Sequence, residues 1–323
     1  MNSPRVIFMG TPGFAVGTLD ALVSAGIEVA AVVTAPDKPA GRGRQLRMSA
    51  VKERAVELGL PVLQPERLRD PAFLAELDRI AASLYVVVAF RMLPEVVWTK
   101  PGLGTVNLHA SLLPQYRGAA PINWALISGE VRTGVTTFLI SHEIDTGDLL
   151  LQEAVDITPD MNAGDLHDEL MRVGAALMVR TVQGLHKGEL KGTPQHVPST
   201  GMLRNAPKIH PGDLLLDPAW TAQRMHDHVR GMSPFPGPWL RLQLDERPHI
   251  QFKVLRTRMA EESVDVSPGT VHLAKGQMLL ACADRWIELL EVQPEGKRRM
   301  TADEFMRGLQ QVKRIYMTAG KIV

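Results

Sequence analysis

Three polar residues, Asn107, His109 and Asp145, are spaced so that they could form one reaction centre. We predict a strand over residues 104–108. Asn107 and His109, two positions apart, then leave the sheet on the same side where this strand ends. The acidic loop that contains Asp145 directly follows the apolar run of residues 135–140. Because open α/β sheets bind ligands at the carboxyl ends of their strands, we expect the two loops to meet there.

These residue types suit acyl transfer. An aspartate beside a histidine favours the charged imidazolium, and an asparagine amide and an imidazolium can both donate hydrogen bonds to an oxyanion. No nucleophile accompanies them, because Cys282 lies far along the chain and Ser111 has no evident base. We therefore expect direct transfer between two bound substrates. The alternative, for an isolated Asn and His, is a purely structural role in a loop.

The elements that must position these residues follow an alternating pattern in the first two hundred residues. Short Val/Ile/Leu runs alternate with segments whose apolar residues recur every three or four positions, which predicts a doubly wound, Rossmann-like parallel sheet. The predicted strands are residues 5–9, 28–34, 84–89, 104–108 and 135–140, and the predicted helices are residues 14–24, 49–58, 72–82 and 163–186. The first turn is not a dinucleotide-binding loop, since Pro12 stands where the second glycine is needed.

The pattern of predicted strands and helices changes near residue 205. One helix at 219–229 precedes short strands at regular intervals, which favours a small OB-like β-barrel. The predicted strands are residues 239–244, 250–255, 269–273, 278–283 and 286–292. We predict a catalytic domain over residues 1–187, a Gly- and Pro-rich linker over 188–205 and a C-terminal domain over 206–323.

Composition narrows the class of protein. The 323 residues are 45% hydrophobic and 22% charged with a net charge of +1, which is the usual globular mixture. The single cysteine excludes a disulfide scaffold and a Cys-rich zinc site, and favours the reducing cytoplasm. No apolar run approaches the ~18 residues of a membrane helix. Residues 1–204 carry a net charge of −2 and residues 205–323 a net charge of +3, so the basic excess lies in the second domain.

The sequence resembles the formyltransferases that use 10-formyltetrahydrofolate. The resemblance is carried by two stretches, Asn107-x-His109-x-Ser111-Leu112-Leu113-Pro114 and Asp145-Thr146-Gly147. Other stretches are similar to the branch of the family that acts on methionyl-tRNA, namely Gly10-Thr11-Pro12-x-Phe14-Ala15 and residues 39–44 and 116–122. Residues 206–209 and 230–237 extend the resemblance into the second domain, so it covers most of the chain.

The resemblance implies transfer of a formyl group from 10-formyltetrahydrofolate to the α-amino group of methionine on initiator tRNA. Asn107 and protonated His109 would stabilise the charge on the formyl oxygen, and Asp145 would hold His109 charged and aligned. The acceptor of the amine proton, a bound water or the Asp145 carboxylate, stays open. By resemblance, folate is contacted by Ser111, Leu112, Leu113 and Pro114.

Basic residues are the expected contacts of methionyl-initiator tRNA. Phosphates attract lysine and arginine, although a cluster of either is more often a solvated surface. The expected contacts are Lys38, Arg42 and Arg44 in a glycine-containing loop of the first domain, and Lys297, Arg298 and Arg299 in the second. We expect a cytoplasmic monomer that binds folate and tRNA, with no metal and no membrane attachment.

Three alternatives remain. A sugar-nucleotide N-formyltransferase would keep the same three polar residues, but it has no need of a basic second domain. A phosphoribosyl-glycinamide formyltransferase would need a glycine-rich phosphate loop after the first strand. A catalytically silent tRNA-binding protein would have no need of an intact Asn107, His109 and Asp145. Two positions, Arg91 and Ser233, depart from the pattern of the family, where Gly and Asn are commoner.

Overall fold

The computed structural model describes residues 4–40, 45–196, 202–274, 276–309, 312 and 314–320. The chain forms two compact units. Unit 1 consists of Met1–Gly118, Arg132–Asp156 and His167–Asn205, and unit 2 of Ala119–Val131, Ile157–Leu166 and Ala206–Val323. Two segments that precede residue 167, 119–131 and 157–166, thus belong to the same unit as the C-terminal residues. Among the helices in the described ranges, none combines the length and apolarity needed to cross a membrane.

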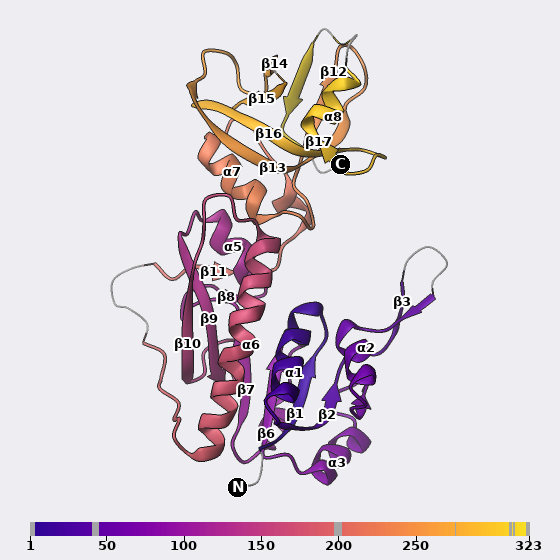
Figure 1. Ribbon diagram of the computed structural model, residues 1–323, viewed down its shortest axis with the longest axis vertical. Coiled ribbons are helices and arrows are strands. Elements are labelled where there is room, and N and C mark those ends of the chain that lie inside the picture. The colour runs from indigo at the N-terminus through magenta and orange to yellow at the C-terminus, as the bar shows by residue number, and fades with distance from the viewer. Residues whose placement is uncertain are drawn as a thin grey trace. The chain divides into compact units, whose positions relative to one another are not determined.

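Unit 1 is built on one sheet that, in the described residues, has seven strands in the order β10-β9-β7-β6-β1-β2-β5 (Figure 1). The central strands β1 and β6 are almost wholly apolar because both faces of the sheet are covered, whereas β7 carries the polar residues Asn107 and His109. The strands are β1 (Arg5–Gly10), β2 (Glu28–Val33), β5 (Val62–Leu63), β6 (Leu84–Val88), β7 (Thr105–His109), β9 (Arg132–Leu139) and β10 (Leu149–Asp156).

The sheet is mixed. It is parallel from β7 to β5, but β9 runs antiparallel to β7, and β10 antiparallel to β9. No crossover helix joins β9 to β10, since a loop of nine residues links them directly. Strand β10 has no counterpart in the sequence prediction. Its residues Gln152, Glu153 and Asp156 interrupt the apolar pattern, as is usual for a strand at the edge of a sheet.

Helices cover the sheet of unit 1. The four predicted helices begin within two residues of their predicted starts, and the short helix α4 was not predicted. The side chains of Ser49 and Asp70 cap α2 and α3 by accepting hydrogen bonds from backbone N–H groups. The long helix α6 packs on β7, where a Cβ added at Gly174 would lie 2.8 Å from Leu108. The elements are α1 (Gly13–Ser24), α2 (Ala50–Glu57), α3 (Pro71–Ile80), α4 (Glu95–Trp98), α6 (Ala163–Lys187), the pair β3 (Lys38–Ala40) and β4 (Gln45–Arg47), and β8 (Arg117–Gly118).

Unit 2 is an antiparallel sheet that closes on itself. Its strand order over the described residues is β14-β15-β16-β13-β12-β18, with β17 also paired to β16. A bridge between Thr270 and Tyr316 joins the two ends, and a Cβ at Gly269 would lie only 2.2 Å from the carbonyl oxygen of Met317. The strands are β12 (Trp239–Leu244), β13 (Ile250–Ser263), β14 (Val271–Ala274), β15 (Gln277–Ala281), β16 (Arg285–Pro294), β17 (Met300–Thr301) and β18 (Ile315–Thr318).

The closed sheet of unit 2 encloses an apolar core that includes Leu240, Phe252 and Ile287. Helix α5 belongs to this unit: the side chain of Asn123 donates a 2.7 Å hydrogen bond to the carbonyl oxygen of Gly231 at the end of α7. The remaining elements are α5 (Pro121–Ile127), β11 (Asn205–Ala206), η1 (Pro211–Leu214), α7 (Ala222–Gly231) and α8 (Ala302–Arg307). The predicted fold class, a Rossmann-like domain followed by a small barrel-like domain, is confirmed.

Candidate active site

The site is centred on the end of β7. Asn107 is half-buried, and its side-chain amide makes no hydrogen bond with any residue in the described ranges. His109, the last residue of the strand, is only 7% exposed. The two residues alternate with Leu108, which faces α6, so they lie on the same side of the strand. One amide thus stays free for a ligand beside a buried imidazole.

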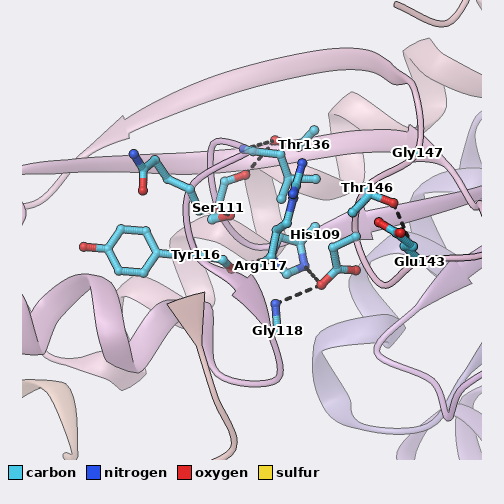
Figure 2. Close-up of polar contacts among 12 residues, drawn as sticks. His109, Ser111, Tyr116, Arg117, Gly118, Thr136, Glu143, Thr146 and Gly147 are labelled. Atoms are coloured by element: carbon cyan, nitrogen blue, oxygen red, sulfur yellow. Dashed lines mark hydrogen bonds and ion pairs between the residues drawn. The ribbon is translucent and has the colours of Figure 1, made fainter. Parts of the chain in front are cut away.

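Both ring nitrogens of His109 face oxygen atoms of the protein (Figure 2). Nε2 lies 2.8 Å from the carbonyl oxygen of Tyr116, to which an Nε2–H donates a hydrogen bond. Nδ1 lies 3.8 Å from Oδ2 of Asp145, which is ion-pair distance but too long for a hydrogen bond. The backbone therefore fixes the ring through Nε2, and Nδ1 remains without a hydrogen bond beside a carboxylate.

The Asp145 carboxylate is held by the loop opposite. Its Oδ2 accepts a 2.9 Å hydrogen bond from the backbone N–H of Gly118, as Figure 2 shows. Asp145 has a φ of +56°, which side-chain-bearing residues adopt infrequently. Two residues on, a Cβ at Gly147 would lie 1.7 Å from the carbonyl oxygen of Leu139, so only glycine fits. Gly147 is thus required by the path of the loop, and Asp145 supplies the carboxylate.

The prediction that both loops leave the sheet at the carboxyl ends of parallel strands is wrong. Because β9 is antiparallel to β7, its last residue Leu139 pairs with Val106, near the start of β7. The loop after β9 therefore leaves at the edge opposite the carboxyl end of β7. It turns back, and Asp145 contacts His109 by this return rather than by the shared edge of parallel strands.

The stretch Ser111, Leu112, Leu113 and Pro114 forms a closely held turn after β7. The Ser111 hydroxyl is buried and donates a 2.6 Å hydrogen bond to the carbonyl oxygen of Gln115. The Thr136 hydroxyl accepts from the N–H of Leu113 and donates to the carbonyl oxygen of Ser111. The amide of Gln152 donates to the Leu113 carbonyl and to the same Thr136 hydroxyl. This network fixes the backbone and leaves Leu112 and Pro114 half-buried.

Neither candidate nucleophile is suited to attack. The Ser111 hydroxyl already donates to a backbone carbonyl. Burial, with a smaller contribution from Asp284, raises the pKa of the Cys282 thiol to about 12, so the reactive thiolate is scarce at neutral pH. Cys282 also lies in the core of unit 2. The geometry favours direct transfer between two bound molecules.

The basic residues expected to contact tRNA lie in both units. Lys38 is exposed at the start of β3, whereas Arg42 and Arg44 lie outside the described residues. In unit 2, Lys297, Arg298 and Arg299 are all exposed in the turn before β17. Arg298 pairs with Glu304 at 3.2 Å, and Arg299 pairs with Glu291. Exposed pairs of this kind contribute little to stability, so both guanidinium groups can exchange partners.

Of the two departures from the family pattern, the structure explains Arg91 but not Ser233. The guanidinium of Arg91 donates to the backbone carbonyl oxygens of Pro65 and Glu66, which secures the neighbouring loop. Partial burial lowers the pKa of Arg91. Ser233 is 1% exposed, and its hydroxyl has no hydrogen-bond partner among the described residues. Nothing in the structure explains that serine.

Several groups that build the site were missed from the sequence. The carbonyl of Tyr116 and the N–H of Gly118 are backbone groups, which no residue type reveals. Thr136 and Gln152 lie on β9 and β10 and act through the turn that follows β7. Gln195 contacts the Asp145 loop from a segment that the sequence marks only as a linker. In the described ranges, no three His, Cys, Asp or Glu side chains gather as metal ligands would.

Two models of known protein families match the sequence. The sequence model of the formyl transferase family matches residues 4–182, and that of the formyl transferase C-terminal domain matches residues 208–310. The chain belongs to the formyl transferase family. Asn107, His109 and Asp145 all lie within the first match, and Lys297, Arg298 and Arg299 within the second.

Curated relatives of this formyl transferase match nearly the whole chain. It is 46% identical over 312 residues to the methionyl-tRNA formyltransferase of Parabacteroides distasonis, covering 95% of this chain and 96% of that protein. The methionyl-tRNA formyltransferase of Bacteroides fragilis is 44% identical over 306 residues, covering 94% of each chain. Each match covers more than nine-tenths of both proteins.

Solved structures share the fold of this formyl transferase at low identity. An N-formyltransferase from Helicobacter canadensis, in complex with folinic acid and dTDP-3-aminofucose, superposes with a TM-score of 0.62 at 17% identity, covering 90% of this chain and 99% of that one. HypX from Aquifex aeolicus, in complex with tetrahydrofolic acid, gives a TM-score of 0.65 at 15% identity over 97% of this chain. The chain spans about half the length of HypX.

Proposed function

We propose that this formyl transferase is a methionyl-tRNA formyltransferase, which moves a formyl group from 10-formyltetrahydrofolate to the α-amino group of methionine on initiator tRNA. The observation that carries the proposal is its 44–46% identity to proteins of that name over 94–96% of their length. The paired His109 and Asp145, beside a free Asn107 amide, support acyl transfer as the chemistry. We also propose that the chain consists of a catalytic domain over residues 1–187, a linker over 188–205 and a C-terminal domain over 206–323.

In this proposal the neutral amine attacks the formyl carbon, and negative charge develops on the formyl oxygen. The bond between the formyl carbon and N10 of the donor then breaks, and tetrahydrofolate leaves with a proton on N10. The Asn107 amide donates to that oxygen, because it has no other hydrogen bond in the described residues. His109 acts through Nδ1, since Nε2 is already bonded to the Tyr116 carbonyl. The Asp145 carboxylate, 3.8 Å from Nδ1, stabilises the imidazolium during the reaction.

The attacking amine must also lose a proton. The Asp145 carboxylate is 12% exposed and already accepts one hydrogen bond, from Gly118, on the oxygen that faces His109. A carboxylate accepts hydrogen bonds at both oxygens, so Oδ1 can receive the proton directly or through a bound water. Neither route requires a protein nucleophile, in keeping with the buried Cys282 and the bonded Ser111.

The folate donor is proposed to lie against the turn of Ser111, Leu112, Leu113 and Pro114. Half-buried Leu112 and Pro114 offer an apolar surface to a flat ring, and the network of Thr136 and Gln152 keeps that surface in place. Folate-type molecules occupy the two solved relatives described above, which are similar to this chain in fold alone. The 10-formyl form of the donor is part of the proposal.

The acceptor tRNA is proposed to contact the basic residues of both units: Lys38, Arg42, Arg44, Lys297, Arg298 and Arg299. Their support is the net charge of +3 over residues 205–323 and the exposure of the described members of the set. Contacts between cations and phosphates release counterions, so binding is expected to weaken with salt. We further propose that the protein works as a cytoplasmic monomer without a metal.

One assay tests the assignment of substrate. Purified protein is incubated with 10-formyltetrahydrofolate and either methionyl-initiator tRNA or an amino-sugar nucleotide, and the formylated product is measured. We expect product with the tRNA alone. Turnover of the sugar nucleotide without turnover of the tRNA would assign the chain to the other acceptor. Binding of tRNA with no turnover of either acceptor would identify a silent binding protein.

A further inference from the structure

Gln195 lies in a segment that is fixed to the sheet of unit 1. Thr193 forms an antiparallel bridge with Leu149, with reciprocal backbone hydrogen bonds of 2.8 and 2.9 Å. At Gly192 a Cβ would lie 2.7 Å from the side chain of Asp148, so the backbone passes close to the end of the loop between β9 and β10. These contacts bring the half-buried Gln195 beside that loop.

The side-chain amide of Gln195 uses both its donors and its acceptor on two loops. Nε2 donates to the carbonyl oxygens of Asp145 and Gly147, both at 2.9 Å. Oε1 accepts a 2.6 Å hydrogen bond from Nη2 of Arg117. The two donor bonds go to the loop that carries the carboxylate, and the acceptor bond goes to the loop that follows β7.

The hydrogen bonds of Gln195 lie next to the groups that hold His109 and Asp145 in place. Arg117 lies between Tyr116, whose carbonyl accepts from His109 Nε2, and Gly118, whose N–H donates to Asp145 Oδ2. Asp145 has a φ of +56°, a conformation that is unfavourable for a residue with a side chain and persists only where neighbours hold it. The hydrogen bond from Gln195 Nε2 to the Asp145 carbonyl oxygen helps to hold Asp145 in this conformation.

We propose that Gln195 is a positioning residue that sets the separation between the Asp145 carboxylate and His109 Nδ1. Its amide ties the 116–118 loop to the 145–147 loop from outside the reacting groups. Through these bonds it keeps Oδ2 within 4 Å of the imidazole without touching a substrate. The inference rests on the proposed function, because it assumes that the His109 and Asp145 pair acts in formyl transfer.

Two variants of similar size separate the hydrogen bonds from the space that the side chain fills. Gln195→Met loses all three hydrogen bonds. Gln195→Glu keeps an acceptor for Arg117 but places a carboxylate oxygen against two carbonyl oxygens. We expect kcat to fall roughly 10- to 100-fold in both, the scale of a small misplacement of reacting groups. KM for folate and for tRNA should change less than about two-fold, because both substrates keep all of their own binding residues.

A control and a double-mutant cycle distinguish positioning from general destabilisation. His196→Ala alters an exposed side chain in the same segment and should retain the kcat of the unmodified protein. In an Asp145→Asn background, Gln195→Met should lower kcat less than about three-fold, because the charge that it positions is already gone. Thermal unfolding of each protein shows whether the variants are folded.

The outcomes separate the two hypotheses. If the unmodified protein does not formylate methionyl-tRNA, the proposed function fails. If it does, and both Gln195 variants keep full kcat, only the positioning role is overturned. A loss of the same size with and without the Asp145 carboxylate would likewise overturn it, as would a rise in KM at unchanged kcat.

Discussion

Replacing Asp145 with asparagine removes a charge from the candidate site with little change of shape. The Asn side chain keeps an oxygen that can accept the hydrogen bond from Gly118, so the loop retains its anchor. It loses only the negative charge that lies 3.8 Å from His109 Nδ1. The side chains of His109 and Asp145 are 8% and 12% exposed, so water screens this charge weakly.

The size of the effect follows from Coulomb's law. Two unit charges about 4 Å apart attract each other by roughly 4 kcal/mol at an effective dielectric constant of about 20. Each ~1.4 kcal/mol of lost transition-state stabilisation slows the reaction about ten-fold. Because His109 is charged in the proposed transition state, loss of this attraction lowers kcat by up to roughly 10³-fold. We expect a loss between about 10² and 10³, which is also the range for losing one oxyanion donor.

The assay is single-turnover formylation of methionyl-initiator tRNA with saturating 10-formyltetrahydrofolate. Asp148→Asn is the matched control, because it removes an exposed carboxylate three residues along the same loop. We expect Asp148→Asn to keep the rate of the unmodified protein. An Asp145→Asn protein that folds and reacts within two-fold of that rate would refute a role for this charge.

Three further predictions concern unit 2. Exchanging Lys297, Arg298 and Arg299 for glutamine should flatten the slope of log affinity for tRNA against log salt, by about one for each phosphate that these side chains neutralise, with folate binding unchanged. The raised pKa of Cys282 predicts that iodoacetamide labels the folded protein at pH 8 far more slowly than the unfolded chain. Burial lowers the pKa of His228, so the folded protein should lose stability as pH falls below about 6.5, and His228→Gln should reduce that loss.

The sign of the His228 effect follows from its surroundings. The buried ring donates a 2.6 Å hydrogen bond to the Asp213 carbonyl oxygen and packs against Trp220. Desolvation disfavours the charged form, and nearby Arg224 adds to this. The unfolded chain therefore binds a proton at a higher pH than the folded one, so stability is complete above about 6.5 and declines toward the lowered folded pKa. Equal acid sensitivity with and without His228, measured by urea unfolding from pH 7 to 5, would contradict this assignment.

The predictions on the salt dependence of tRNA binding and on Cys282 labelling can each be contradicted by one result. A slope of log affinity that is unchanged in the triple variant would remove Lys297, Arg298 and Arg299 from the tRNA-binding surface. Rapid labelling of Cys282 in the folded protein would show that its thiol is less buried than its place in the core of unit 2 requires.

The central strands and the long helix of unit 1 could be predicted because one physical cause dominates each. Residues 6–9 and 84–88 are buried on both faces, so their sequence is apolar. Helix α6 keeps its apolar stripe over 25 residues. Strand β10 lies at the edge of the sheet and carries polar residues, and the short helices α5 and α8 have too few turns to show a period.

The candidate site shows the same division. Asn107, His109 and Asp145 could be selected because their residue types carry the chemistry. The groups that hold them could not be, because the Tyr116 carbonyl and the Gly118 N–H are common to all residue types. Gln195 reaches the Asp145 loop across 50 residues of sequence. A single sequence contains no signal for such a pairing, since a glutamine in a polar segment is ordinarily solvated.

The direction of β9 decides how Asp145 reaches His109, and the strand pattern does not reveal that direction. The apolar run of residues 135–140 fits a parallel or an antiparallel neighbour equally well. In the structure β9 runs antiparallel to β7, so its last residue Leu139 lies beside Val106, near the start of β7. The loop must then turn back from the far edge, and the positive φ of Asp145 and the close approach at Gly147 are consequences of that turn. Substituting Gly147 should therefore displace the carboxylate without touching any group that reacts.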